Sequence, residues 1–155
     1  MSATPDSGFA TLLELEAEEC YRLLAGHEIG RLGVFAEHYP LIFPVNYALD
    51  RGDVIVVRTH AGTMLAAASH ANVTFEVDDI DRRRRSGWSV LVRGLAEELT
   101  SAHRAELIER TTHSGVRPWA PGEHERWMRI IPHDISGRRI VPNDLPPPFG
   151  PSAYL

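Results

Sequence analysis

Apolar and polar residues alternate over several short stretches of the chain, and alternation of this kind predicts β-strands. Pro44 interrupts one of these stretches, which indicates a sheet edge or a bulge at that position. Asp50, Arg51 and Gly52 separate two of the stretches and are typical of a hairpin turn. Strands are therefore predicted at 30–36, 41–49, 54–59, 72–77, 88–99 and 126–135.

Short helices are predicted between the strands. One lies at 17–25 and is ended by Gly26, and an alanine-rich one lies at 63–70. A third is predicted at 101–110, with Ser101 as its N-cap. Loops are predicted at 78–87 and 111–124.

The elements together predict a mainly β protein with short helices. About six strands at hairpin spacing, with few helices, favour a closed or nearly closed antiparallel barrel. We expect one domain over 13–141, preceded by a flexible N-terminus at 1–12 and followed by a proline-rich tail at 142–155.

Composition and charge exclude several classes of protein. The net charge of −5 argues against non-specific binding to nucleic acid or to an anionic membrane, and no apolar run is long enough to span a bilayer. The single cysteine, Cys20, excludes an intrachain disulfide and a cysteine-rich metal site. We expect no signal peptide at the N-terminus, and a cytoplasmic protein.

The chain contains no lysine, and all sixteen of its basic residues are arginine. Catalysis through a lysine Schiff base is therefore excluded, and so is a P-loop nucleotide hydrolase. A bound phosphate would have to be held by arginine, hydroxyl groups, backbone N–H groups or a helix N-terminus.

The segment Val57 to Leu65, VRTHAGTML, combines these groups. A predicted strand ends with Arg58 and Thr59, a glycine-containing turn follows, and a predicted helix opens at Thr63. This order of groups is typical of a phosphate site. The alternative is a plain strand-to-helix turn in which Thr63 serves as the N-cap.

Other segments have weaker signals. A bulge at Pro44 would expose backbone amides to a planar ligand, or Pro44 marks a sheet edge. Trp88 is either a core residue or a cofactor contact, and Arg93 is a candidate for a surface ion pair. The four arginines at 82–85 are typical of a solvated loop.

Several catalytic or metal-binding motifs are absent from the sequence. The eight histidines have no zinc-type spacing beside other ligands, so no metal centre is predicted. The serine hydrolase motif GxSxG and the dinucleotide motif GxGxxG are both absent, and no triad accompanies Cys20.

Taken in order, the segments resemble the pyridoxamine 5′-phosphate oxidase-like family of FMN-binding split barrels. The resemblance covers roughly residues 13–141, and the order and spacing of the segments make it specific. The matching stretches are EECYRLL at 18–24, IGRLGV at 29–34, PVNY at 44–47, RTHAGTML at 58–65, TFEVD at 74–78, GWSVLVRG at 87–94, PWAPG at 118–122 and RIIP at 129–132.

The resemblance implies a six-stranded antiparallel split β-barrel that forms a homodimer with FMN at the subunit interface. The strand of Val45 and Asn46 would lie along the isoalloxazine ring, and Arg58, Thr59 and Thr63 would hold the phosphate. The cofactor-binding residues expected from the resemblance and the motifs are Pro44, Val45, Asn46, Tyr47, Arg58, Thr59, His60, Gly62, Thr63, Met64, Trp88, Ser89, Val90 and Trp119.

Two departures from the family pattern matter. Relatives usually carry a lysine where Met64 stands, so FMN binding is expected to be weaker, or His60 substitutes in part. The last strand ends in Gly137-Arg138-Arg139-Ile140 without the histidine of the true oxidase, so oxidation of pyridoxamine phosphate is not predicted.

The resemblance implies an FMN-dependent oxidoreductase of unknown small-molecule substrate. No residue is an obvious general acid or base, as is common where the cofactor performs the chemistry. The alternatives are a non-catalytic flavin carrier or redox sensor, and a relative that binds a deazaflavin coenzyme or haem.

Overall fold

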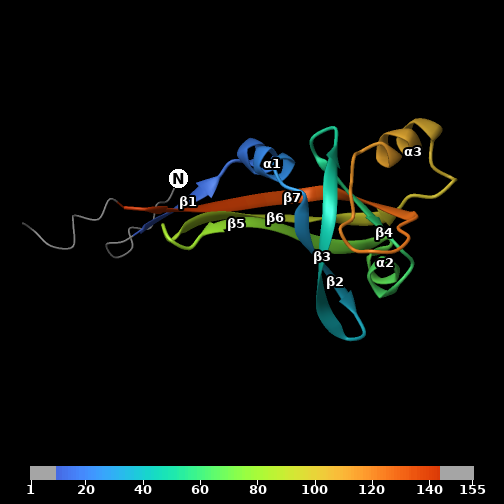
Figure 1. The fold of residues 1–155 in the computed structure, drawn as a ribbon, viewed down its shortest axis with the longest axis horizontal. Coiled ribbons are helices and arrows are strands. Elements are labelled where there is room, and N and C mark those ends of the chain that lie inside the picture. Colours follow the sequence, from blue (N-terminus) through green and yellow to red (C-terminus); the bar gives the residue numbers. More distant parts are fainter. Residues whose placement is uncertain (1–9, 144–155) are drawn as a thin grey trace, which may run out of the picture.

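The computed structural model describes residues 10–143. Seven strands and three short helices make up this part of the chain (Figure 1). In chain order they are β1 (Ala10–Leu15), α1 (Ala17–Ala25), β2 (Ile29–Ala36), β3 (Tyr39–Asp50), β4 (Val54–Thr59), α2 (Thr63–Ala68), β5 (Ala71–Asp81), β6 (Ser86–Glu98), α3 (Ala105–Thr112) and β7 (Arg126–Pro142).

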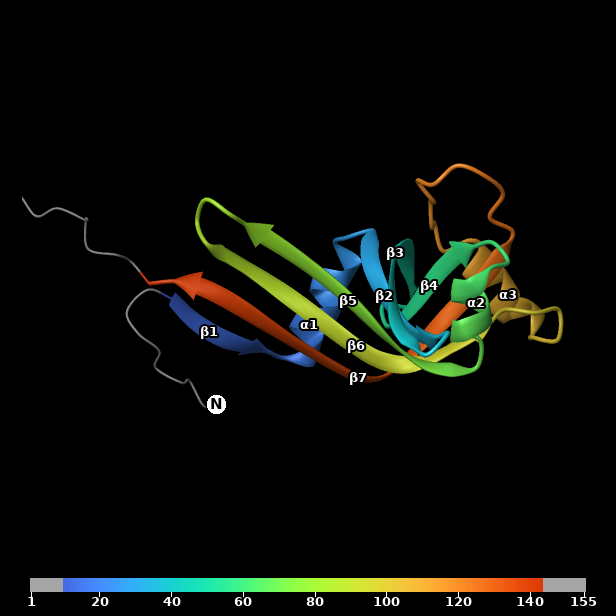
Figure 2. The ribbon, with the colours of Figure 1, turned by 90° about the horizontal axis from the view of Figure 1, so that it is seen from below.

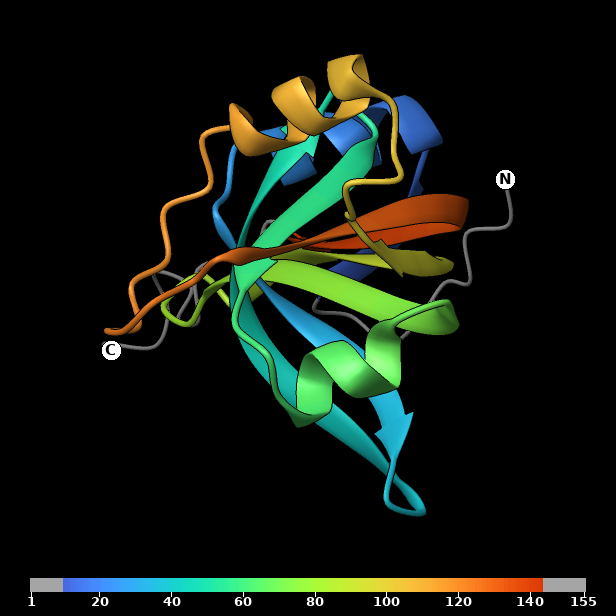
Figure 3. The ribbon, with the colours of Figure 1, turned by 90° about the vertical axis from the view of Figure 1, so that its right-hand side faces the viewer.

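Six of the strands close into an antiparallel barrel. The sheet order is β1-β7-β4-β3-β2-β5-β6, and β7 also pairs with β6, so the ring closes through β7. β1 stays outside the ring and pairs along the outer part of β7. Figure 3 views the barrel from the end that carries α2 and α3. The predicted six-stranded antiparallel split barrel, mainly β with short helices, is confirmed.

The barrel interior is filled by alternate residues of its strands. Leu32, Phe75 and Val92 are fully buried there, whereas their neighbours in sequence point outward. A Cβ atom at Gly30 would clash with Phe75 Cζ, so glycine is required where the Phe75 ring reaches β2. The ring of Tyr47 meets that of Phe75 edge to face, with centroids 5.0 Å apart.

Two helices cover one side of the long sheet and the third covers the other side (Figure 1). The predicted end of α1 at Gly26 is confirmed, and Leu24 of this helix is fully buried against the barrel. The predicted start of α2 is also confirmed, but the helix ends at Ala68, because its C-cap Ser69 has an extended backbone with ψ of 119°. His70 then takes a left-handed conformation with φ of 56°. No helix within residues 10–143 is long and apolar enough to cross a membrane.

The predicted loop at 78–87 is wrong, because most of it continues β5 and β6. The pairing runs on from Asp78↔Ser89 to Asp81↔Ser86, which leaves a turn at 82–85. Both faces of this distal hairpin are largely exposed, so its residues lack the apolar alternation of a half-buried strand. The four arginines of the turn are exposed, as expected for a solvated segment.

β7 is longer than predicted and β1 was missed. β7 extends to Pro142, and Ala10 of β1 pairs with Pro142 at its end. Proline is tolerated there because it ends the strand. Residues 10–12 of the expected flexible segment therefore belong to β1, while residues 1–9 and residues 144–155 of the expected tail lie outside the described residues.

The third helix begins four residues later than predicted. Its N-cap is Arg104 rather than Ser101, and it continues to Thr112. Ser101 instead lies in a turn in which the backbone N–H of Thr100 donates to His103 Nδ1 at 3.0 Å. The hydroxyl of Ser101 is thus too far upstream to cap the helix.

Candidate functional site

A cavity of about 370 Å³ opens where β3 and β4 separate. The two strands pair only from Tyr47↔Val57 onward within the described chain. Before that point 44–46 pair with β2, and after it Arg58 and Thr59 pair with β7. The predicted residues that line this cavity together are Pro44, Val45, Asn46, Arg58, Thr59, His60, Gly62, Thr63 and Met64.

Arg58 supplies a permanent positive charge to the cavity. Its side chain is exposed, its Nε donates to the backbone oxygen of His124 at 2.6 Å, and its guanidinium lies 5.2 Å from the centroid of Trp127. Trp127 is the register partner of Arg58 on β7. The guanidinium of Arg58 is therefore oriented by His124, just before β7, and by Trp127, near the start of β7.

Two hydroxyl groups stand beside this cation. Thr59 is buried and its Oγ1 lies 3.5 Å from the oxygen of His60, whereas Thr63 is exposed at the start of α2. The alternative prediction that Thr63 caps the helix is wrong, because the N-cap is Gly62 and no side chain caps α2. The Thr63 hydroxyl is thus not used as a helix cap.

The loop at 113–125 forms another wall of the cavity through Pro118, Ala120 and His124. The backbone N–H of Trp119 donates to Asn46 Oδ1 at 2.8 Å, which joins this loop to β3. The indole of Trp119 itself is 66% exposed beside the cavity. Sequence reasoning missed His124, which lies 66 positions after Arg58 and follows no recognisable motif.

Four of the predicted cofactor residues lie away from this cavity in the single chain. Tyr47 is buried in the core, its hydroxyl donates to the Leu24 oxygen at 2.6 Å, and burial raises its pKa. Val90 is fully buried inside the barrel. Trp88 and Ser89 line a separate hollow together with residues near the end of β7.

Arg58 and Trp88 lie at different points along β7. Arg58 pairs with Trp127, and Trp88 pairs with Arg139, twelve residues further along the strand. At about 3.3 Å per residue the two positions are about 40 Å apart along the strand. Trp88 lies nearer to the Asn46 side of the cavity, because its ring centroid is 4.8 Å from that of His27 and Asn46 Nδ2 lies 3.4 Å from the backbone oxygen of Glu28. Figure 2 shows the distal end of β5 and β6 far from α2 and β4.

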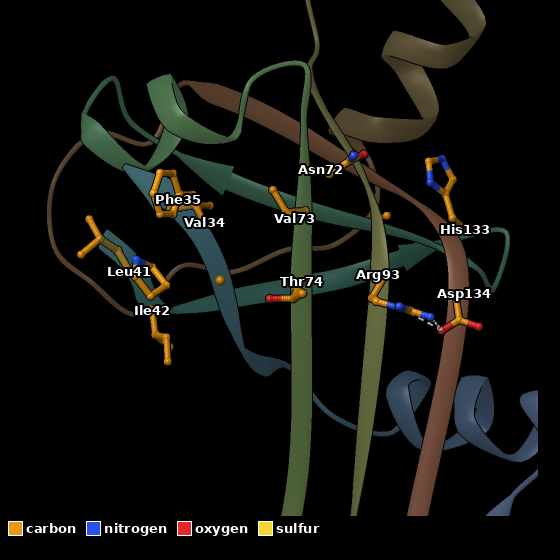
Figure 4. A pocket seen from close by; sticks show the side chains of 13 residues that line it. Val34, Phe35, Leu41, Ile42, Asn72, Val73, Thr74, Arg93, His133 and Asp134 are labelled. Carbon is orange, nitrogen blue, oxygen red and sulfur yellow. Dashed lines mark hydrogen bonds and ion pairs between the residues drawn. The ribbon is translucent and has the colours of Figure 1, made fainter. Parts of the chain in front are cut away.

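A larger hollow, of about 650 Å³, lies on the outer face of the sheet (Figure 4). Phe35 and Ile42 stand on one side of it, 71% and 72% exposed. On the other side Arg93 Nη2 lies 2.8 Å from Asp134 Oδ2, so the candidate surface ion pair of Arg93 is confirmed. The sequence pattern did not reveal this hollow, because its lining comes from several separate strands.

Cys20 and the metal-binding side chains offer no second reactive centre within residues 10–143. No group of three or more histidine, cysteine, aspartate or glutamate residues converges there. Cys20 is fully buried, and burial raises the pKa of its thiol, which keeps the thiol in its unreactive protonated form.

Comparison with known proteins establishes the family. The family model described as pyridoxamine 5′-phosphate oxidase matches residues 16–139. The chain belongs to this family. An uncharacterized protein from Mycobacterium tuberculosis is 35% identical over 150 residues, which cover 94% of this chain and 95% of that protein.

Solved structures agree with the family assignment. An FAD binding protein from Mycobacterium smegmatis is 34% identical, covers 82% of this chain and 98% of its own, and superposes with a TM-score of 0.69. A protein of unknown function from Corynebacterium diphtheriae is 28% identical, with coverage of 84% and 98% and a TM-score of 0.69. This family member thus has the barrel of its relatives over most of its length.

Proposed function

We propose that this family member binds a flavin nucleotide in the cavity between β3 and β4. The observation that supports this most directly is the convergence of Arg58, Thr59 and Thr63 at one cavity whose other wall is the middle of β3. A cation with hydroxyls suits a phosphate. The FAD binding protein at 34% identity supports a flavin as the bearer of that phosphate.

The residues present fit the phosphorylated end of a flavin. Phe43, Pro44 and Val45 supply apolar surface for carbon atoms, and Pro44 has no backbone N–H that could be left unpaired there. No carboxylate of the described residues lines the cavity, so nothing in this lining repels an anion. The volume of about 370 Å³ lies at the lower end of the range for ligand pockets.

FMN is the flavin that we expect, since the cavity is small and the chain resembles FMN-binding split barrels. FAD shares the flavin 5′-phosphate, and the relative from Mycobacterium smegmatis is described as binding FAD. The phosphate contacts proposed for Arg58, Thr59 and Thr63 apply to both ligands. Direct titration distinguishes the two flavins.

We further propose that the protein works as a homodimer. Trp88 and Ser89 are expected at the cofactor, yet they lie about 40 Å along β7 from Arg58 in the same chain. A twofold partner would present its own Trp88 to the end of the cavity that holds Arg58. The exposed apolar side chains of Phe35 and Ile42 give a second reason to expect a partner surface.

A bound flavin would supply electron transfer, and the chain would supply its binding and orientation. We therefore propose an oxidoreductase that acts on a small molecule. Reduction of the bound flavin by NADPH, followed by turnover of a quinone or nitro compound, would support this proposal. Tight flavin binding without any turnover would instead favour a carrier or redox sensor.

Titration of the purified protein with FMN, FAD and riboflavin tests the flavin proposal. We expect quenching of flavin fluorescence at one flavin per chain, with FMN bound more tightly than riboflavin because only FMN has the phosphate. Absence of quenching by FMN and by FAD at high micromolar protein would show that the cavity does not hold a flavin.

A further inference from the structure

Two imidazole rings stand in the cavity together with Arg58. His60 follows the end of β4, and His124 precedes the start of β7, yet both line the same cavity. Their ring centroids are 5.8 Å apart, in an edge-to-face arrangement. A cavity that suits a phosphate thus has two histidines beside its one permanent cation.

The hydrogen bond of His124 determines which of its nitrogens carries a proton. Nδ1 lies 2.9 Å from the backbone oxygen of Gly122, and a carbonyl oxygen can only accept, so Nδ1 carries hydrogen. The neutral ring then has a bare Nε2, which cannot donate to a phosphate oxygen. Protonation of Nε2 gives the ring a second donor and a positive charge together.

Few other charges face these two rings. Arg58 on β4 is the only other charged residue in the lining of the cavity, as far as the described residues show. Glu123 and Glu125 flank His124 in sequence but do not belong to the lining. Arg126, the next cation along the chain, is paired with Glu98. The electrostatics of the cavity therefore depend on one permanent and two titratable cations.

We propose that His60 and His124 are phosphate-binding residues that take up protons when the flavin phosphate binds, so that they set its affinity through pH. This inference rests on the proposed flavin site and adds its regulation. A phosphate stabilises the protonated rings, so affinity is greatest where histidine is charged and falls as pH rises through the range in which histidine titrates. Riboflavin lacks the phosphate and gains nothing from either ring.

The dissociation constants of FMN, FAD and riboflavin, measured between pH 6.5 and 8.5, test this inference. Above pH 6.5 the phosphate of FMN stays mostly dianionic, since a phosphate monoester loses its second proton near about pH 6. The bridging phosphates of FAD have no such proton, so any pH dependence with FAD comes from the protein. We expect FMN to bind about five- to twentyfold more weakly at pH 8.5 than at pH 6.5.

Asparagine variants assign the effect to the two rings. Asparagine is chosen because, in His124→Asn, the amide nitrogen can still donate to the Gly122 oxygen while the titratable nitrogen is lost. We expect the double variant His60→Asn/His124→Asn to show less than about a twofold change over the same pH range, and His124→Asn alone an intermediate one. His70→Asn, at an exposed residue outside the cavity, is the matched control and should behave as the wild type.

Calorimetry in buffers of different ionisation enthalpy gives a second readout, because the heat of binding depends on the buffer only when binding takes up or releases protons. We expect FMN binding to take up protons in the wild type and not in the double variant. The inference is overturned if the double variant keeps the wild-type pH dependence, or if riboflavin shows the same dependence as FMN. Either result leaves flavin binding itself intact. Failure of all three flavins to bind the wild type at any pH would overturn the flavin proposal as well.

Discussion

Arg58 is oriented by its neighbours before any ligand is present. One guanidinium nitrogen donates to the His124 backbone oxygen and the plane packs near Trp127, while no other hydrogen bond of this side chain occurs among residues 10–143. Its two terminal nitrogens are thus available for a ligand. Because the side chain is already ordered, binding loses less conformational entropy than it would with a mobile arginine.

The first prediction at the residue scale concerns Arg58→Ala. A charge-assisted hydrogen bond contributes about 1.5–3 kcal/mol, so this variant should bind FMN roughly ten- to a hundredfold more weakly. Riboflavin affinity should hardly change, since the lost contact is to the phosphate. Fluorescence titration of both ligands measures the difference, and equal weakening of the two would mean that Arg58 supports the fold instead.

Met64→Lys is the converse variant. Met64 lines the cavity, so a lysine there should add a second permanent cation and tighten FMN selectively over riboflavin. The gain should shrink at high salt, because the cavity is open to solvent. If FMN and riboflavin tighten equally, the new side chain acts on the flavin ring or on the fold and not on the phosphate.

Sequence reasoning reached only part of the site. Arg58, Thr59 and Thr63 could be found because a strand, a turn and a helix start bring them together within one short segment. His124 could not, since its place depends on a loop that returns to β4 from a distant part of the chain. The position of Trp88 could not be predicted either, because it depends on the register in which β6 pairs with β7.

At the scale of elements, a cluster of charges ties α3 to the barrel. Asp50 at the end of β3 is only 7% exposed, and its Oδ2 lies 2.9 Å from Nη1 of Arg129 and 3.1 Å from Nη2 of Arg110. Arg129 also donates to Thr111 on α3. Burial alone would raise the pKa of Asp50, but the hydrogen bonds and charges of the two arginines outweigh burial and lower it.

We predict that Asp50→Asn lowers the free energy of unfolding by about 3 kcal/mol at neutral pH, because it leaves the buried charge of Arg129 without its partner. The pKa of Asp50 is lower in the folded protein than in the unfolded chain. Asp50 therefore contributes to stability at pH values above the ordinary pKa of aspartate, and this contribution is lost as pH falls through the folded pKa. The difference in unfolding free energy between Asp50→Asn and the wild type should therefore become smaller at acidic pH.

Urea denaturation at neutral and acidic pH measures this gap. Glu106→Gln is the control, since Glu106 is exposed and contacts the same Arg110, and it should change stability by less than about 0.5 kcal/mol. If the stability difference between Asp50→Asn and the wild type stays constant from neutral to acidic pH, the ionised carboxylate of Asp50 is not what stabilises the protein.

The strands that surround the core could be predicted from the sequence, whereas the distal arm could not. β4 was predicted with its observed ends because a buried strand bounded by turn residues has a clear apolar signal. β1 and the outer parts of β5, β6 and β7 are largely exposed to solvent, and their pairing partners, not their composition, make them strands. A pattern confined to neighbouring residues cannot show such pairing.

At the scale of the whole molecule, Arg58 of the cavity and Trp88 of the separate hollow pair with β7 twelve residues apart, and Figure 2 shows the distal ends of β5 and β6 far from β4. We expect the flavin to contact Arg58 of one chain and Trp88 of a second copy. Sedimentation should therefore give a mass near twice 17.3 kDa. A clean monomer at micromolar concentration that still binds FMN would contradict the proposed dimer.

Trp88→Ala tests whether the partner completes the site. In a dimer this variant should weaken FMN and riboflavin equally, by about fivefold, because stacking on an aromatic side chain contributes about 1 kcal/mol and involves the ring rather than the phosphate. Mixed dimers of Arg58→Ala and Trp88→Ala chains should regain one wild-type site per two chains. Failure to regain it would locate the effect of Trp88 within its own chain.

β7 comes last in the described chain, yet it holds the barrel closed by pairing with β4 and β6, and it also holds β1. During synthesis the first strands leave the ribosome without the neighbour that completes the ring. The pairing of Ala10 with Pro142 joins residues from nearly opposite ends of the described chain, and such distant contacts slow folding. The cavity, whose Arg58 is held against Trp127, therefore forms only after the start of β7 has been made.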